Sequence, residues 1–188
     1  MLLVLGGARS GKSTFAEEEV KKYEALTTGA HVLYVATALA FDEGMKDRIK
    51  KHQAQRPSHW HTLESYKGFD KLDGNEDFKR SQIIMMDCMT LMITNLLLEY
   101  TGDFDTISRT EIEELEKGII EEVDVFVKMC HLHQKQLVIV ANEVGLGLVP
   151  PYRLGSIFRD IAGRINQKLA KEATEVYLLT AGLPLQLK

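Results

Sequence analysis

Short apolar runs alternate with amphipathic segments along this chain. Five runs look like strands buried on both faces, and they cover residues 2–5, 31–37, 82–88, 136–142 and 175–181. Segments with helical periodicity separate most of them. This alternation predicts an α/β fold in which a mostly parallel sheet is covered by helices on both faces. The tail LPLQLK could add an antiparallel edge strand.

Apolar stripes at helical spacing predict three long helices. They lie over residues 12–26, from Ser108 to Cys130, and between Ile157 and Leu169, where an apolar residue recurs at every fourth position. Ser108 and Glu111 form a capping-box pattern at the start of the second helix. Residues 66–82 are polar and show no periodicity, so we expect a surface connection there.

Composition limits the kind of protein further. With 188 residues, 45% of them hydrophobic, the chain predicts a single domain over residues 1–188. Its formal net charge of -4 lacks the basic footprint that nucleic-acid binding requires. Cys88 and Cys130 show neither zinc nor disulfide spacing, which suits a reducing cytoplasm. The opening MLLVL has no basic flank and is short, so we expect neither a signal peptide nor a membrane span.

The first apolar run leads into GGARSGKS, which matches the phosphate-binding pattern G-x-x-x-x-G-K-[ST] between a predicted strand and a predicted helix. Glycines let successive amide N–H groups point at phosphate oxygens at the start of a helix. Lys12 would then reach the β- and γ-phosphates, and Ser13 would bind Mg²⁺. The alternative is a glycine turn without a ligand. The predicted nucleotide contacts in this loop are Gly6, Gly7, Ala8, Arg9, Ser10, Gly11, Lys12 and Ser13.

Asp87 follows the apolar run IIMM, where a phosphate-binding enzyme needs a second metal-holding group. An aspartate at a strand end can equally be a helix cap or a turn residue. Together with the phosphate loop, Asp87 favours a metal role. The two features predict a nucleoside-triphosphate enzyme and leave its acceptor open.

Three histidines lie close together, at His52, His59 and His61. Residues 42–55 favour a helix in which Met45, Ile49 and His52 share one face, and Pro57 ends it. His52 could therefore be a partly buried packing residue. The three histidines could also hold a metal, although no cysteine or carboxylate cluster supports this. In the third interpretation, a neutral imidazole attacks a phosphorus atom as a nucleophile. Periodicity does not decide among them.

Longer segments identify a family. LGGARSGKSTFAEE, RIKKHQAQRPSHWHTLE, DCMTLMITNLL and ANEVGLGLVPPYRLGSIFRDIAGRINQ follow one another over nearly the whole chain. Together they resemble the bifunctional adenosylcobinamide kinase / adenosylcobinamide-phosphate guanylyltransferase family of adenosylcobalamin biosynthesis. The segment NEVG, then VP and FRDIAGRINQ, is far more restrictive than the phosphate loop. The resemblance implies a RecA-like P-loop domain that assembles as a homotrimer.

The resemblance also implies two reactions. A nucleoside triphosphate, ATP or GTP, phosphorylates the aminopropanol hydroxyl of adenosylcobinamide. GTP then guanylylates an enzyme histidine with release of pyrophosphate, and the phosphorylated corrinoid takes the GMP to give adenosylcobinamide-GDP. Two rival functions remain at this point: a RecA-like ATP-binding motor or switch, and a P-loop small-molecule kinase without guanylyl transfer.

The family pattern R-I-x-x-H before R-P falls on Arg48, Ile49 and His52, which implies that His52 is the nucleophile. The NEVG segment, residues 142–145, could contact the corrinoid or phosphate, or could be only a tight connection. Outside the phosphate loop, the resemblance implies nucleotide contacts at Ala36, Thr37, Ala38, Gln53, Ala54, Gln55, Arg56, Glu64 and Asp87.

Overall fold

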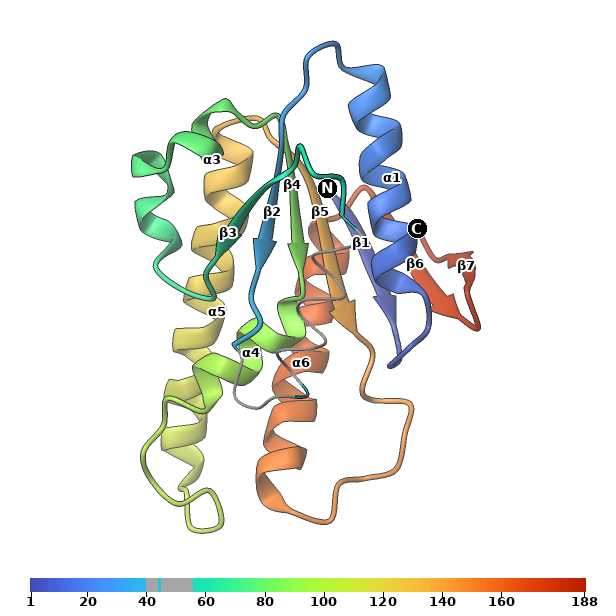
Figure 1. Ribbon diagram of the computed structural model, residues 1–188. Helices are drawn as coiled ribbons and strands as arrows, with labels where there is room; N and C mark the ends of the chain where they lie inside the picture. The colour runs from blue at the N-terminus through green and yellow to red at the C-terminus, as the bar shows by residue number, and fades with distance from the viewer. Residues whose placement is uncertain (40–43, 45–55) are drawn as a thin grey trace.

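The computed structural model describes residues 1–39, 44 and 56–188 and shows a seven-stranded sheet (Figure 1). The strand order is β3-β2-β4-β5-β1-β6-β7, and every neighbouring pair is parallel except β6 and β7. The α/β fold and the antiparallel edge strand predicted from the sequence are therefore confirmed. The strands are β1 Leu2–Gly6, β2 Val32–Ala36, β3 His61–Glu64, β4 Ile83–Asp87, β5 Gln136–Asn142, β6 Glu175–Thr180 and β7 Leu183–Gln186.

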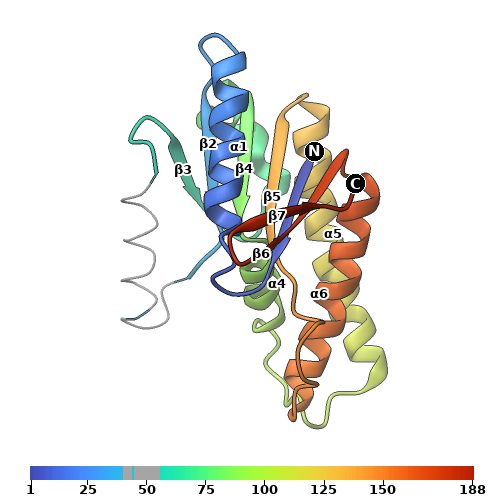
Figure 2. The ribbon, with the colours of Figure 1, turned by 90° about the vertical axis from the view of Figure 1, so that its right-hand side faces the viewer.

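Helices cover both faces of the sheet (Figures 1 and 2). Helix α1, Lys12–Leu26, packs Ala16 and Val20 on one face. The other face carries three helices, α4 Met89–Leu97, α5 Arg109–Leu132 and α6 Arg153–Glu172. Successive strand residues point to opposite faces, so each strand contributes to both hydrophobic layers.

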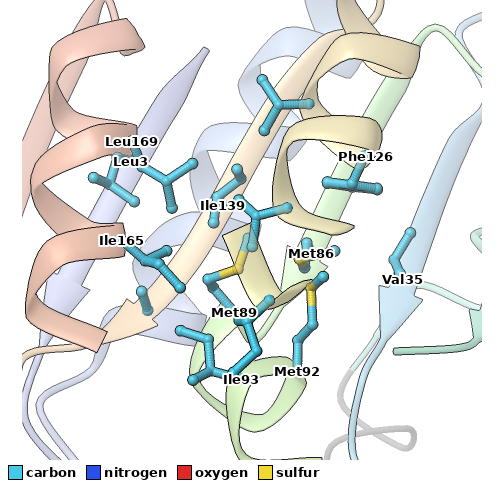
Figure 3. Packing of buried hydrophobic residues seen from close by; sticks show 14 of the residues in the cluster. Leu3, Val35, Met86, Met89, Met92, Ile93, Phe126, Ile139, Ile165 and Leu169 are labelled. Atoms are coloured by element: carbon cyan, nitrogen blue, oxygen red, sulfur yellow. The ribbon is translucent and has the colours of Figure 1, made fainter. Parts of the chain in front are cut away.

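The layer beneath α4, α5 and α6 forms the larger part of the core. Figure 3 shows side chains from the strands, such as Met86 and Ile139, meeting those from the three helices. Met89 and Ile93 project from α4, and Ile165 projects from α6 (Figure 3). All five are at most 1% exposed. This packing fixes the helices that begin at the carboxyl ends of the strands, where ligands bind in open α/β sheets.

The expectation of a plain surface connection over residues 66–82 is wrong. The segment contains the 3₁₀ helix η1, Phe69–Gly74, and the short helix α3, Glu76–Arg80. Phe69, Leu72 and Phe78 are at most 3% exposed, and the Phe69 ring lies 4.8 Å from that of Phe126 on α5. Three apolar residues among many charged ones give no clear period, and tertiary packing decides their structure instead.

Other local predictions are confirmed. The Ser108 hydroxyl accepts from the Glu111 N–H, and the Glu111 carboxylate accepts from the Ser108 N–H, which is the expected capping box. Cys88 and Cys130 are both buried and free. The helix expected over 42–55 lies outside the described residues. Within those residues, no helix has the length and apolar character to cross a membrane.

Candidate nucleotide site

The phosphate loop runs from the end of β1 to the start of α1, at the edge where the parallel strands end (Figure 1). Gly11 takes a φ of 90° at the N-cap of α1, which a residue with a side chain adopts only with strain. A Cβ on Gly6 would overlap the Ser10 hydroxyl and lie 2.9 Å from the Leu179 carbonyl oxygen of β6. Both glycines therefore permit a loop path that alanine would disturb.

Neighbouring backbone holds the loop on both sides. The Gly6 carbonyl accepts a hydrogen bond from the Glu143 N–H at 3.1 Å, just beyond β5. The Ser10 carbonyl accepts one from the Gly182 N–H at 3.0 Å, in the turn between β6 and β7. Lys12 is 8% exposed, and its Nζ donates to the Gly7 carbonyl at 3.1 Å. Its ammonium group thus lies folded back over the loop.

Asp87 ends β4, opposite Ala36 of β2 and Val140 of β5. Strand β5 separates β4 from β1, so the carboxylate and the phosphate loop leave the same edge two strands apart. The Tyr34 hydroxyl donates to Asp87 Oδ2 at 2.8 Å. Burial, followed by the charge of Asp87, holds the pKa of Tyr34 well above its usual 10, so this hydroxyl keeps its proton. The bond fixes one oxygen of Asp87.

Two further charged groups lie beside this pair. The guanidinium of Arg56 lies over the Tyr34 ring, 3.4 Å from its centroid. Glu17, on the helical turn of α1 after Ser13, is 8% exposed. Burial raises the pKa of Glu17 above its usual 4.5; Lys21 opposes the rise and Asp87 adds to it. Two carboxylates, those of Glu17 and Asp87, therefore lie near Tyr34, and the positive charge of Arg56 partly compensates them.

The family model described as cobinamide kinase / cobinamide phosphate guanyltransferase matches residues 2–187. The chain belongs to this family.

Curated relatives agree with the cobinamide kinase / cobinamide phosphate guanyltransferase assignment. The bifunctional adenosylcobalamin biosynthesis protein CobU of Escherichia coli K12 is 40% identical over 188 residues, covering 100% of this chain and 99% of its own. Protein CobP of Pseudomonas aeruginosa, with the same description, is 37% identical and covers 99% and 96%. Among solved structures, the flagellar accessory protein FlaH of Methanocaldococcus jannaschii covers 100% of this chain and 77% of its own, with 17% identity and a TM-score of 0.49.

Several residues expected to contact nucleotide in this cobinamide kinase / guanyltransferase chain come together at one edge. Ala36 ends β2, Thr37 and Ala38 follow it, and Glu64 lies opposite Ala36 in the parallel pair with β3. Arg56 and Asp87 both contact Tyr34, the first at its ring and the second at its hydroxyl. His52, Gln53, Ala54 and Gln55 lie outside the described residues.

Buried hydrogen bonds join the end of β2 to the start of α4. The Thr37 hydroxyl donates to the Cys88 carbonyl at 2.7 Å and accepts from the Cys88 N–H at 2.9 Å. Asn95 Nδ2 donates to the Thr37 carbonyl at 2.7 Å, and the Asp87–Cys88 peptide bond is cis. Thr37 therefore stabilises the backbone that follows Asp87, in addition to any contact with nucleotide.

His59 and His61 have partners away from the phosphate loop. His59 Nε2 lies 2.7 Å from Glu24 Oε1, and the Trp60 indole donates to the other oxygen of Glu24 at 3.2 Å. His61 Nδ1 lies 3.3 Å from Asp77. Among the residues that the structure describes, no group of three histidines, cysteines or carboxylates could hold a metal.

Two residues beside Asp87, Tyr34 and Glu17, were not predicted from the sequence as part of the site. Tyr34 lies within a run of apolar residues, where an aromatic side chain is typical of core packing. Glu17 lies four residues after Ser13, on the face of α1 that Ala16 and Val20 bury. A charged residue on an otherwise buried helix face was the signal that could have identified it.

Proposed function

We propose that this chain phosphorylates adenosylcobinamide on its aminopropanol hydroxyl and then converts the phosphate to adenosylcobinamide-GDP. The family match over residues 2–187 supports both activities. The observation that carries the proposal is the phosphate loop and Asp87 at one edge of the sheet, beside Arg56. This edge offers cationic and amide donors for a triphosphate, as a phosphoryl-transfer site requires.

In the kinase step, backbone amides of residues 6–13 would bind the phosphates of ATP or GTP. Lys12 would leave the Gly7 carbonyl and bind the β- and γ-phosphates, because phosphate oxygens are stronger partners for an ammonium group. The attacking corrinoid hydroxyl would form a bond to the γ-phosphorus and give its proton to water. The bond between that phosphorus and the β-γ bridging oxygen would break, and the nucleoside diphosphate would leave.

Mg²⁺ is the metal that fits this donor set. It usually binds one or two protein carboxylates together with phosphates and water, and Asp87 has one oxygen fixed by Tyr34. We propose that Asp87, directly or through water, and the Ser13 hydroxyl hold it. When bound, the ion neutralises charge on the phosphate oxygens.

In the guanylyl step, we propose His52 as the nucleophile, from its position in the family pattern. A nitrogen of the imidazole would bond to the α-phosphorus of GTP, and the bond to pyrophosphate would break. A phosphate oxygen of the phosphorylated corrinoid would then attack the same phosphorus and release the histidine. Arg56, four residues after His52 in the sequence, would bind the phosphates.

Labelled GTP tests the proposal. The protein is incubated with Mg²⁺ and GTP labelled at the α- or γ-phosphate, then denatured, and protein-bound label is measured. We expect acid-labile, alkali-stable α-label that His52→Ala abolishes. His59→Ala is the matched control, because His59 pairs with Glu24 away from the phosphate loop, and it should retain the label.

The other outcomes identify the rival functions. Phosphorylated cobinamide without α-label on the protein would indicate a kinase that lacks guanylyl transfer. Nucleotide hydrolysis without either product would indicate a motor or a switch. Either result would refute the bifunctional assignment for this chain.

We also propose a single domain over residues 1–188, from its length and composition, and a location in the cytoplasm, from its cysteine usage. The family resemblance adds the proposal that the chain assembles as a homotrimer. One cooperative unfolding transition would support the single domain. Light scattering on the eluting protein measures its mass, and a mass of one 21.2 kDa chain would contradict the trimer.

A further inference from the structure

One buried side chain, Tyr34, joins two groups that the proposed reactions would use separately. Tyr34 lies in β2, is 1% exposed and points to the α1 face of the sheet. Its hydroxyl donates to Asp87 Oδ2 at 2.8 Å, and its ring lies under the Arg56 guanidinium. A tyrosine that only filled the core would need neither contact.

The stacking leaves the arginine available for an anion. Arg56 Nε and Nη1 are buried and have no hydrogen-bond partner among the described residues. A guanidinium group donates in its own plane, so contact through its face occupies none of its five N–H groups. Buried N–H groups without acceptors are costly, and phosphate oxygens would supply acceptors for them.

The surrounding charges fit the same interpretation. Glu17 and Asp87 both act on Tyr34 electrostatically, and the charge of Arg56 opposes the rise in the pKa of Glu17. Among the described residues, neither carboxylate accepts a hydrogen bond from Arg56 Nε or Nη1. Tyr34 therefore supplies the direct contact that holds the arginine.

We propose that Tyr34 is a positioning residue for both half-reactions: its hydroxyl orients Asp87 toward the metal-nucleotide complex, and its ring presents the Arg56 N–H groups to the phosphates of GTP. The proposal rests on the proposed function for the identity of the two reactions. The contacts with Asp87 and Arg56 can be tested by binding alone. Tyr34 itself touches neither the substrate nor the metal.

Two substitutions separate the hydroxyl from the ring. Tyr34→Phe removes the bond to Asp87 and keeps the aromatic face. Replacement of Tyr34 by pentafluorophenylalanine also removes the bond, and it reverses the sign of the ring quadrupole that attracts a cation while nearly keeping the shape. Tyr66→Phe is the matched control, because the Tyr66 hydroxyl donates to the Glu99 carboxylate at 2.9 Å on the surface.

The readouts are binding affinities and two activities. Affinity for GTP is measured with a fluorescent analogue in EDTA, affinity for Mn²⁺ in the presence of GTP by electron paramagnetic resonance, and kinase and guanylylation rates separately. For Tyr34→Phe we expect about tenfold weaker Mn²⁺ binding, equivalent to about 1.4 kcal/mol. Metal-free GTP binding should change less than about twofold, because the ring remains.

The fluorinated variant should lose the same Mn²⁺ affinity as Tyr34→Phe. In addition, its metal-free GTP affinity should fall about three- to tenfold and its guanylylation should slow, because the ring no longer attracts the Arg56 guanidinium. Tyr66→Phe should match the wild type in every readout. Circular dichroism checks that all variants are folded.

Unchanged Mn²⁺ affinity in Tyr34→Phe would overturn the role of the hydroxyl. Equal metal-free GTP affinity in the phenylalanine and fluorinated variants would overturn the role of the ring. Failure of the proposed function looks different: the wild type would bind GTP and Mn²⁺, the variants would shift as expected, and no α-label or phosphorylated cobinamide would form.

Discussion

Replacement of Gly6 by alanine tests how closely the phosphate loop depends on the strand beside it. Gly6 lies opposite Leu179 in the parallel pair of β1 and β6. The added Cβ would overlap the Ser10 hydroxyl and approach the Leu179 carbonyl oxygen to 2.9 Å. The Ser10 side chain can rotate away. The carbonyl belongs to a paired strand and cannot.

The strain can be estimated from that contact. Ordinary C···O contacts begin at about 3.3 Å, so the two backbones must separate by about 0.4 Å. Overpacking of this kind costs roughly 1–3 kcal/mol. With about 2 kcal/mol, the midpoint of thermal unfolding should fall by roughly 4–8 °C for a chain of this size. Because the loop itself must move, nucleotide affinity should fall at least about tenfold.

Gly7→Ala is the control, since nothing lies within 4 Å of its Cβ position and its φ is not positive. Its unfolding free energy should stay within about 0.5 kcal/mol of the wild type. Thermal unfolding is followed by circular dichroism, and nucleotide affinity by titration with a fluorescent GTP analogue. Equal unfolding midpoints for the two alanine variants would refute the close approach of β1 and β6 as the reason for glycine at position 6.

Three other predictions concern the fold around the site. Asn166→Leu should lower the free energy of unfolding in urea by about 1–3 kcal/mol, because Asn166 Nδ2 donates to the Asn142 carbonyl at 3.0 Å and leucine would leave that carbonyl without this partner; an unchanged midpoint would contradict this. Burial raises the pKa of Cys88 to about 11 and that of Cys130 to about 12, so neither thiol should react with a disulfide reagent at pH 8 until the protein unfolds, when both react. Hydrogen bonds from Ser108 lower the pKa of Glu111 from its usual 4.5, so its contribution to stability is present above pH 4.5 and is lost as pH falls through the lowered value. Glu111→Gln should therefore reduce thermal stability at pH 7, and the difference from wild type should shrink in acid; a difference independent of pH would exclude the capping carboxylate as its cause.

Periodicity predicted most of the fold because the strands are buried on both faces. Runs such as QLVIVAN have no polar side of their own, and only a sheet between two helical layers accommodates them. The capping box was equally local, since Ser108 and Glu111 lie within one helical turn. In contrast, Phe69 packs on Phe126 of α5, and Phe78 lies against His133 at the C-cap of α5, both more than 50 residues away in sequence. No local pattern contains that information.

The candidate site shows the same division. The phosphate loop was predictable because its eight residues are contiguous and each fixed position of its pattern has a known role. Tyr34 and Arg56 are 22 positions apart, and Asp87 lies a further 31 positions on. Only the sheet order brings these three together, and an aromatic residue inside a strand carries no sign of what its hydroxyl or its ring will contact.

The turn between β6 and β7 gives the phosphate loop a dependence on the most exposed strand of the sheet. Gly182 donates to Ser10, and β7 is exposed along its whole length. Edge strands of this kind open locally more often than central ones. Each opening releases the Ser10 carbonyl, so the measured affinity for nucleotide is the intrinsic affinity multiplied by the fraction of molecules in which the hairpin is closed. Reciprocity then requires that bound nucleotide slows amide hydrogen exchange in β7, a strand with no phosphate contact of its own.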